Sequence, residues 1–106
     1  MTFVVFAWSG IERTLPEQDA LVVVGLLRAR VELRPSAGEL ADRIEAEARG
    51  GIFGRPAQNV TLDEDGFHDL VAALDRLETL GLLTAALRSL QMALRGERRP
   101  GEPGYH

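Results

Sequence analysis

Residues 3–10 read Phe-Val-Val-Phe-Ala-Trp-Ser-Gly, and this stretch predicts a β-hairpin at the start of the chain. Every position from Phe3 to Trp8 is apolar, which is typical of a central strand that is covered on both faces, at least in part. Gly10 can adopt the positive φ that a tight hairpin turn requires. Residues 11–15 are therefore expected to return as a shorter and more polar strand.

The segment after the hairpin predicts a helix over residues 16–30, with a strand as the competing interpretation. Residues 14–17 have the pattern of a capping box, and the apolar residues that follow recur at helical spacing. The strand interpretation depends on the β-branched residues 22–24 and on the period-two alternation of residues 28–34. We expect a helix that is followed by an extended segment ending at Pro35.

The second half of the chain predicts three further helices and one short strand. Ser36 and Glu39 form another capping-box pattern, and a pair of glycines closes the helix that they open. Residues 59–62 have the composition of a strand. Asp63 is expected to cap the most regular helix of the chain, which Gly81 separates from the last one. These two helices should form an antiparallel hairpin or one kinked helix.

Together these elements predict an α+β fold, in which a small antiparallel sheet of about three strands is packed by about four helices. A chain of 106 residues has the size of one domain. We expect that domain to span residues 1–95. Residues 96–106 are rich in glycine, proline and charge, so they are expected to form a mobile tail.

The composition excludes several chemistries and partners. Without cysteine, the chain has no disulfide, thiolate metal site or cysteine nucleophile. The net charge of −4 argues against nucleic-acid binding, and the longest apolar run, residues 20–27, is far shorter than the roughly twenty residues of a membrane span. We expect a cytoplasmic protein whose partners include neither nucleic acid nor membrane. All twelve basic residues are arginine, as codon bias in a GC-rich bacterial genome would produce.

No pattern of side chains predicts a catalytic or metal site. Asp65, His68 and Asp69 occupy adjacent turns of one helix, but carboxylates near a helix N-terminus also stabilise its dipole. Their spacing matches no closed metal motif. No serine lies in a nucleophile elbow, and the glycine-rich loop follows a helix, whereas a phosphate-binding loop precedes one. We therefore expect no metal and no cofactor, and we favour a protein without catalytic activity.

A pair of apolar residues in the glycine-rich loop is the first candidate contact with a partner. Ile52 and Phe53 lie between glycines, with Arg55 close behind. If their side chains are exposed, they can anchor a partner protein. If they fold back over the sheet, they close the core instead. In the first case Phe53→Ala would weaken binding, and in the second it would weaken folding.

Leucine-rich helices supply the second candidate contact. Leu80, Leu82 and Met92 lie off the main apolar stripes, and excess apolar helix surface commonly forms a symmetric dimer interface. A larger intramolecular core is the alternative. We expect a small protein-interaction domain, such as an adaptor, an inhibitor or an immunity-type protein, that forms a homodimer or binds another protein. The alternative function is a ligand-binding or catalytic domain with Trp8 as a wall of its pocket.

Overall fold

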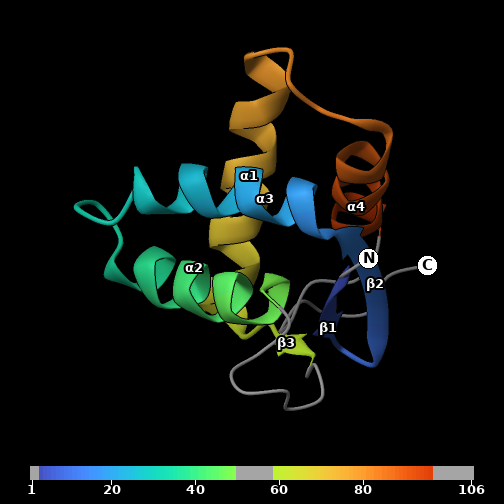
Figure 1. The fold of residues 1–106 in the computed structure, drawn as a ribbon, viewed down its shortest axis with the longest axis horizontal. Helices are drawn as coiled ribbons and strands as arrows, with labels where there is room; N and C mark the ends of the chain where they lie inside the picture. The colour runs from blue at the N-terminus through green and yellow to red at the C-terminus, as the bar shows by residue number, and fades with distance from the viewer. Residues whose placement is uncertain (1–2, 50–58, 97–106) are drawn as a thin grey trace.

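The computed structural model describes residues 3–49 and 59–96, which form a three-stranded sheet and four helices (Figure 1). The strands are β1 (Phe3–Trp8), β2 (Ile11–Pro16) and β3 (Val60–Thr61). The helices are α1 (Glu17–Arg28), α2 (Pro35–Ala48), α3 (Glu64–Thr79) and α4 (Ala85–Gly96). The predicted α+β fold with an N-terminal hairpin is confirmed.

The hairpin of β1 and β2 has the turn that the sequence predicts. Ser9 and Gly10 have φ values of 48° and 80°, the left-handed geometry of a two-residue hairpin turn. Thr14 lies within β2, opposite Val5. The predicted capping box at residues 14–17 is therefore wrong. The N-cap of α1 is Pro16, which has no side chain that could cap the helix.

The sheet is mixed, with strand order β2-β1-β3. Phe6 lies opposite Val60 and Ala7 opposite Thr61, so β3 runs parallel to β1. The prediction of a wholly antiparallel sheet is wrong at this strand. A tight turn forces β2 to run antiparallel to β1, whereas β3 follows two helices and can enter in either direction.

The two faces of β1 differ in burial. Alternate side chains from Val4 to Trp8 are at most 2% exposed, and they face the helices. On the opposite face, Val5 and Ala7 are half-buried and Phe3 is 46% exposed. The sequence predicted that β1 is covered on both faces, at least in part. The face toward the helices is fully covered, and the opposite face is partly covered.

The connection between α1 and α2 is a compact turn. Arg30 N donates to Leu27 O at 3.0 Å, and Arg34 N donates to Arg30 O at 2.9 Å. The predicted extended segment is wrong because these backbone groups find their hydrogen-bond partners locally. The turn reverses the chain, so α1 and α2 lie side by side in front of α3 (Figure 1).

The predicted hairpin of α3 and α4 is present. Asp63 caps α3 as predicted, since its Oδ1 accepts a hydrogen bond from Gly66 N at 2.7 Å. Arg88 lies beside Glu78 and Arg95 beside Asp75, so α4 runs back along α3. The main leucine stripes of both helices are buried in the core: Leu70, Leu74, Leu77, Leu87, Leu90 and Leu94. These leucines belong to the intramolecular core, whereas Leu80, Leu82 and Met92, which lie off the main stripes, are exposed.

Within residues 3–49 and 59–96, no helix has both the length and the apolar composition needed to cross a bilayer.

Candidate functional site

The turn between α3 and α4 holds two exposed leucines on a hydrogen-bonded backbone. Gly81 N donates to Glu78 O at 3.0 Å and Leu82 N donates to Leu77 O at 2.9 Å, while Gly81 has a φ of 72°. This is the Schellman arrangement, in which a left-handed glycine ends the helix. It fixes Leu80 and Leu82, which are 48% and 56% exposed. We call these two residues and Gly81 the leucine turn.

A polar network beneath the leucine turn ties α4 to α3. Gln91 is 3% exposed, and its Nε2 donates to Asp75 Oδ1 at 3.1 Å and to Glu78 Oε1 at 3.3 Å. Arg95 donates to the same two carboxylates. The hydrogen bond with Asp75 is the main cause that raises the pKa of Arg95 above its ordinary value. The network fixes α4 against α3. It therefore also fixes the two helix ends that the leucine turn connects.

Met92 does not belong to the leucine turn. It is 65% exposed on α4, seven residues beyond Ala85, the first residue of that helix. Seven residues of α-helix rise by about 10 Å. Met92, which was predicted to contact a partner together with Leu80 and Leu82, therefore lies apart from the leucine turn on the surface.

The loop residues predicted to bind a partner, Ile52, Phe53 and Arg55, lie outside the described residues. The choice between an exposed anchor and a closed core at Phe53 therefore stays a prediction.

Trp8 lies in the core. Its side chain is 2% exposed, and the edge of its ring packs against Phe67 with the centroids 6.2 Å apart. Its indole Nε1 is buried and has no hydrogen-bond partner among the described residues. The ring is enclosed by protein, and its contact with Phe67 connects the sheet to α3.

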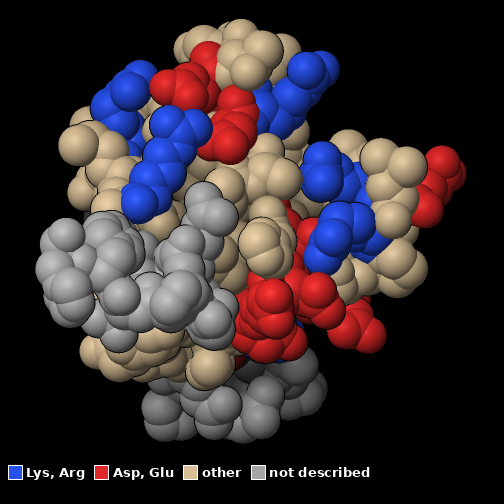
Figure 2. All heavy atoms as spheres, turned by 180° about the vertical axis from the view of Figure 1, so that it is seen from behind, with Lys and Arg blue, Asp and Glu red and all other residues tan. Residues whose placement is uncertain are grey.

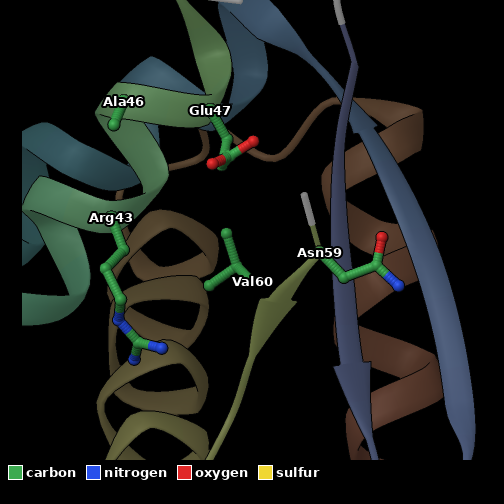
Figure 3. A pocket seen from close by; sticks show the side chains of 5 residues that line it. All are labelled: Arg43, Ala46, Glu47, Asn59 and Val60. Carbon is green, nitrogen blue, oxygen red and sulfur yellow. The ribbon is translucent and has the colours of Figure 1, made fainter. Parts of the chain in front are cut away.

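A small open pocket lies between α2 and β3 (Figure 3). Its volume is about 190 Å³, and it is lined by Arg43, Ala46, Glu47, Asn59 and Val60. Arg43 donates to Thr61 O at 2.9 Å, and Asn59 Nδ2 donates to Glu12 Oε2 at 2.8 Å. Two of the polar groups around the pocket are thus already bound to protein, and Figure 3 shows that Asn59 points away from Val60.

The helical trio of Asp65, His68 and Asp69 does not form a metal site. Asp69 is fully buried, and its two oxygens accept hydrogen bonds from Arg34 Nε and Ser36 Oγ, both at 2.6 Å. Asp65 also binds Arg34, at 3.2 Å. In the described part of the chain, no group of three or more metal-ligating side chains comes together.

On the face shown in Figure 2, the charged side chains of the described residues are mixed in sign, and arginines and carboxylates lie next to one another. The ion pairs that connect α1 with α2 and α3 with α4 are of this kind.

One exposed apolar surface was not identified from the sequence. Val22 is 41% exposed and Gly25 faces open space on the outward side of α1. The signal that could have found it is the apolar run of residues 20–27, which is too long to be buried on one side of a surface helix.

Comparison with protein-family models, curated proteins and solved structures found no match to this chain.

Proposed function

We propose that this protein is a non-catalytic protein-interaction domain, of the adaptor, inhibitor or immunity type, that forms a homodimer and binds another protein through the leucine turn. The supporting observation is the pair of half-exposed leucines on a rigid turn. Fully burying a leucine is worth about 1.5–3 kcal/mol relative to leaving it exposed. The remaining exposed surface of Leu80 and Leu82 is therefore a substantial source of binding free energy.

The construction of the turn favours binding. A backbone fixed by hydrogen bonds loses little conformational entropy when a partner docks, so more of the contact energy appears as affinity. Exposed charged side chains lie close to the turn in the chain: Arg76 and Glu78 belong to the end of α3, and Arg88 of α4 pairs with Glu78 at 4.0 Å. An apolar centre with a charged rim is the usual arrangement of a protein–protein contact, in which the rim selects the partner.

The test compares complexes of the wild-type protein with those of the double variant Leu80→Ser/Leu82→Ser, isolated from the native cell and examined by native mass spectrometry. The matched control is Leu33→Ser. Leu33 is 80% exposed, and it lies in the turn between α1 and α2. We expect the double variant to lose a protein partner that the control retains. Retention of every partner by the double variant, or an equal loss in the control, would contradict this function.

A small-ligand function is the second candidate, and the pocket between α2 and β3 is the observation that favours it. Its lining includes one carboxylate and one guanidinium, those of Glu47 and Arg43, and this pair of opposite charges would suit a small zwitterion such as an amino acid that exchanged for their present protein contacts. Ala46→Leu should fill the pocket. If a panel of amino acids raises the melting temperature of the wild type but not of this variant, the second candidate replaces the first.

A further inference from the structure

The carboxylates beside the leucine turn are already bound within the protein. Asp75 and Glu78 accept hydrogen bonds from Gln91 Nε2 at 3.1 and 3.3 Å. Arg95 of α4 forms ion pairs with the same two side chains. The negative charge at this end of α3 is therefore largely neutralised by α4.

Arg76, in contrast, is exposed, and its guanidinium has no hydrogen bond or ion pair with any described residue. The sequence of α3 gives the reason. A helix places the residues three and four positions away beside Arg76, and none of these four carries a carboxylate: Ala72, Ala73, Thr79 and Leu80. Asp75 and Glu78 lie one and two positions away, and residues at these separations do not face each other on a helix.

Arg76 lies on the same side of α3 as the first exposed leucine of the turn. Leu80 N donates to Arg76 O at 3.0 Å, so the helical spacing continues to Leu80. Residues four apart are neighbours on a helix surface, and the unpaired cation therefore borders Leu80. Arg88 of α4 adds a second cation, because its contact with Glu78 is 4.0 Å long, beyond the range of a hydrogen bond.

The leucine turn thus combines exposed apolar side chains with positive charge that the protein leaves uncompensated. A carboxylate complements a guanidinium well, because its two oxygens can accept two parallel N–H hydrogen bonds. A cationic segment would place like charges together, which costs several kcal/mol of binding free energy. The neighbouring leucines require apolar side chains on the same segment.

From the exposed leucines and the unpaired arginine we infer that the partner presents an acidic amphipathic segment to the leucine turn. Its apolar side chains contact Leu80 and Leu82, and one of its carboxylates binds Arg76. This inference rests on the proposed function and names the chemistry of the partner protein.

The chain offers a direct test because it contains no lysine. Arg76→Lys keeps the positive charge and introduces a single side-chain amine. A water-soluble carbodiimide joins an amine to a carboxylate through an amide bond without a spacer, so it links only groups that are in contact. Complexes of this variant are isolated from the native cell, treated with the carbodiimide and mapped by tandem mass spectrometry. We expect a cross-link from position 76 to an aspartate or glutamate of another protein, with an apolar residue within about four residues of it.

The matched control is Arg13→Lys, which introduces the same amine at an exposed position of β2, far from the leucine turn (Figure 1). This control should give no cross-link to the partner. The wild type shows what the α-amino group contributes. Arg76→Lys combined with Leu80→Ser/Leu82→Ser should lose the cross-link, because the apolar contact holds the acidic segment in place.

The partner identified in this way is then titrated against charge variants. Arg76→Gln should raise the dissociation constant by about two- to fivefold, as the loss of one ion pair does. Arg76→Glu should raise it by at least about tenfold, because it places like charges together. Arg13→Glu makes the same change of net charge elsewhere and should leave the dissociation constant within about twofold at physiological salt. Circular dichroism of each variant controls for folding.

The outcomes that contradict the inference differ from those that contradict the proposed function. A complex that depends on the two leucines, but gives no cross-link from position 76 or is not weakened by Arg76→Glu, excludes an acidic partner, although the proposed function stands. A cross-link that Arg13→Lys also gives, or that survives replacement of the leucines, shows a contact unrelated to the turn and overturns the inference. A cross-link to a second copy of this chain overturns it as well and assigns the turn to the homodimer. If no complex depends on the two leucines, the proposed function itself is wrong.

Discussion

Asp69 brings a carboxylate into the interior between α2 and α3. It is fully buried, and its oxygens accept hydrogen bonds from Arg34 and Ser36. A buried charge is tolerated only when its partners replace the lost water, and removing one partner leaves the others uncompensated. Asp69 therefore fixes the start of α2 against α3 through two hydrogen bonds that are both short.

Replacement of Asp69 should reveal this role. We expect Asp69→Ala to lower the free energy of unfolding by about 2–3 kcal/mol, because Ser36 Oγ and Arg34 Nε lose their acceptor. The control is Asp65→Ala, which removes the other carboxylate bound to Arg34. Its side chain is 67% exposed, so the loss should be below about 1 kcal/mol. Equal losses in urea unfolding curves would show that Asp69 is no more than another surface ion pair.

Ser36 shows where prediction from local sequence stops. The pattern of Ser36 and Glu39 is that of a capping box, yet α2 begins at Pro35 with Arg34 as its N-cap. The Ser36 hydroxyl donates to a carboxylate 33 residues away in the chain. The spacing of Ser36 and Glu39 indicates only the hydrogen bonds that these residues can make to nearby backbone groups. It carries no information on Asp69, a carboxylate acceptor that only the folded chain brings beside Ser36.

At the scale of elements, α1 and α2 are joined by a bridge of alternating charges. Arg28 of α1 donates to Asp42 and Glu45 of α2, and Arg49 donates to Glu45 from the next turn. The hydrogen bond from Arg49, followed by that from Arg28, lowers the pKa of Glu45 below its ordinary value of 4.5. The bridge is therefore sensitive to acid.

The sign of this dependence follows from the lowered pKa. A carboxyl group whose pKa is lower in the folded state stabilises the fold above its unfolded-state pKa, and this contribution is lost as the pH falls through the folded-state pKa. We expect Glu45→Gln to be less stable than the wild type at about pH 7, and the difference to shrink toward zero at about pH 2. Glu39→Gln, at an exposed position of the same helix, is the matched control and should cost less stability than Glu45→Gln at neutral pH. A difference for Glu45→Gln that is constant with pH would exclude an ionic contribution.

The elements differ in how well the sequence predicted their bounds, direction and buried side. α3 was predicted closely, since Asp63 caps it and its apolar stripe is regular. The direction of β3 was not predictable, because two residues after two helices carry no signal of strand orientation. The helical spacing of the apolar residues predicted that Val23 and Val24 lie on the buried side of α1, and both are buried. The exposure of Val22 on the other side was not identified from the sequence.

At the scale of the whole molecule, one core connects every described element. Buried residues from all three strands and all four helices belong to a single apolar cluster, which extends from Val4 to Leu94. The radius of gyration is 13.2 Å, close to the roughly 13 Å of a compact chain of this length. The composition predicted one domain, and a shared core of this kind gives it a physical basis.

A single core predicts a single unfolding transition, and Trp8 allows this to be measured. Trp8 is the only tryptophan of the chain, and from the end of β1 its ring packs against Phe67 of α3. Its fluorescence therefore reports on the contact between sheet and helices, while far-ultraviolet circular dichroism reports mainly on the helices. In urea, the two signals should change with the same midpoint and the same slope, because the hairpin cannot leave the core without exposing the helices that cover it. Phe67→Leu, which trims the Trp8 contact, should shift both curves together by about 1–2 kcal/mol. Fluorescence that changes at lower urea than the dichroism would mean that the sheet detaches first, and the one-domain description of residues 1–95 would then be wrong.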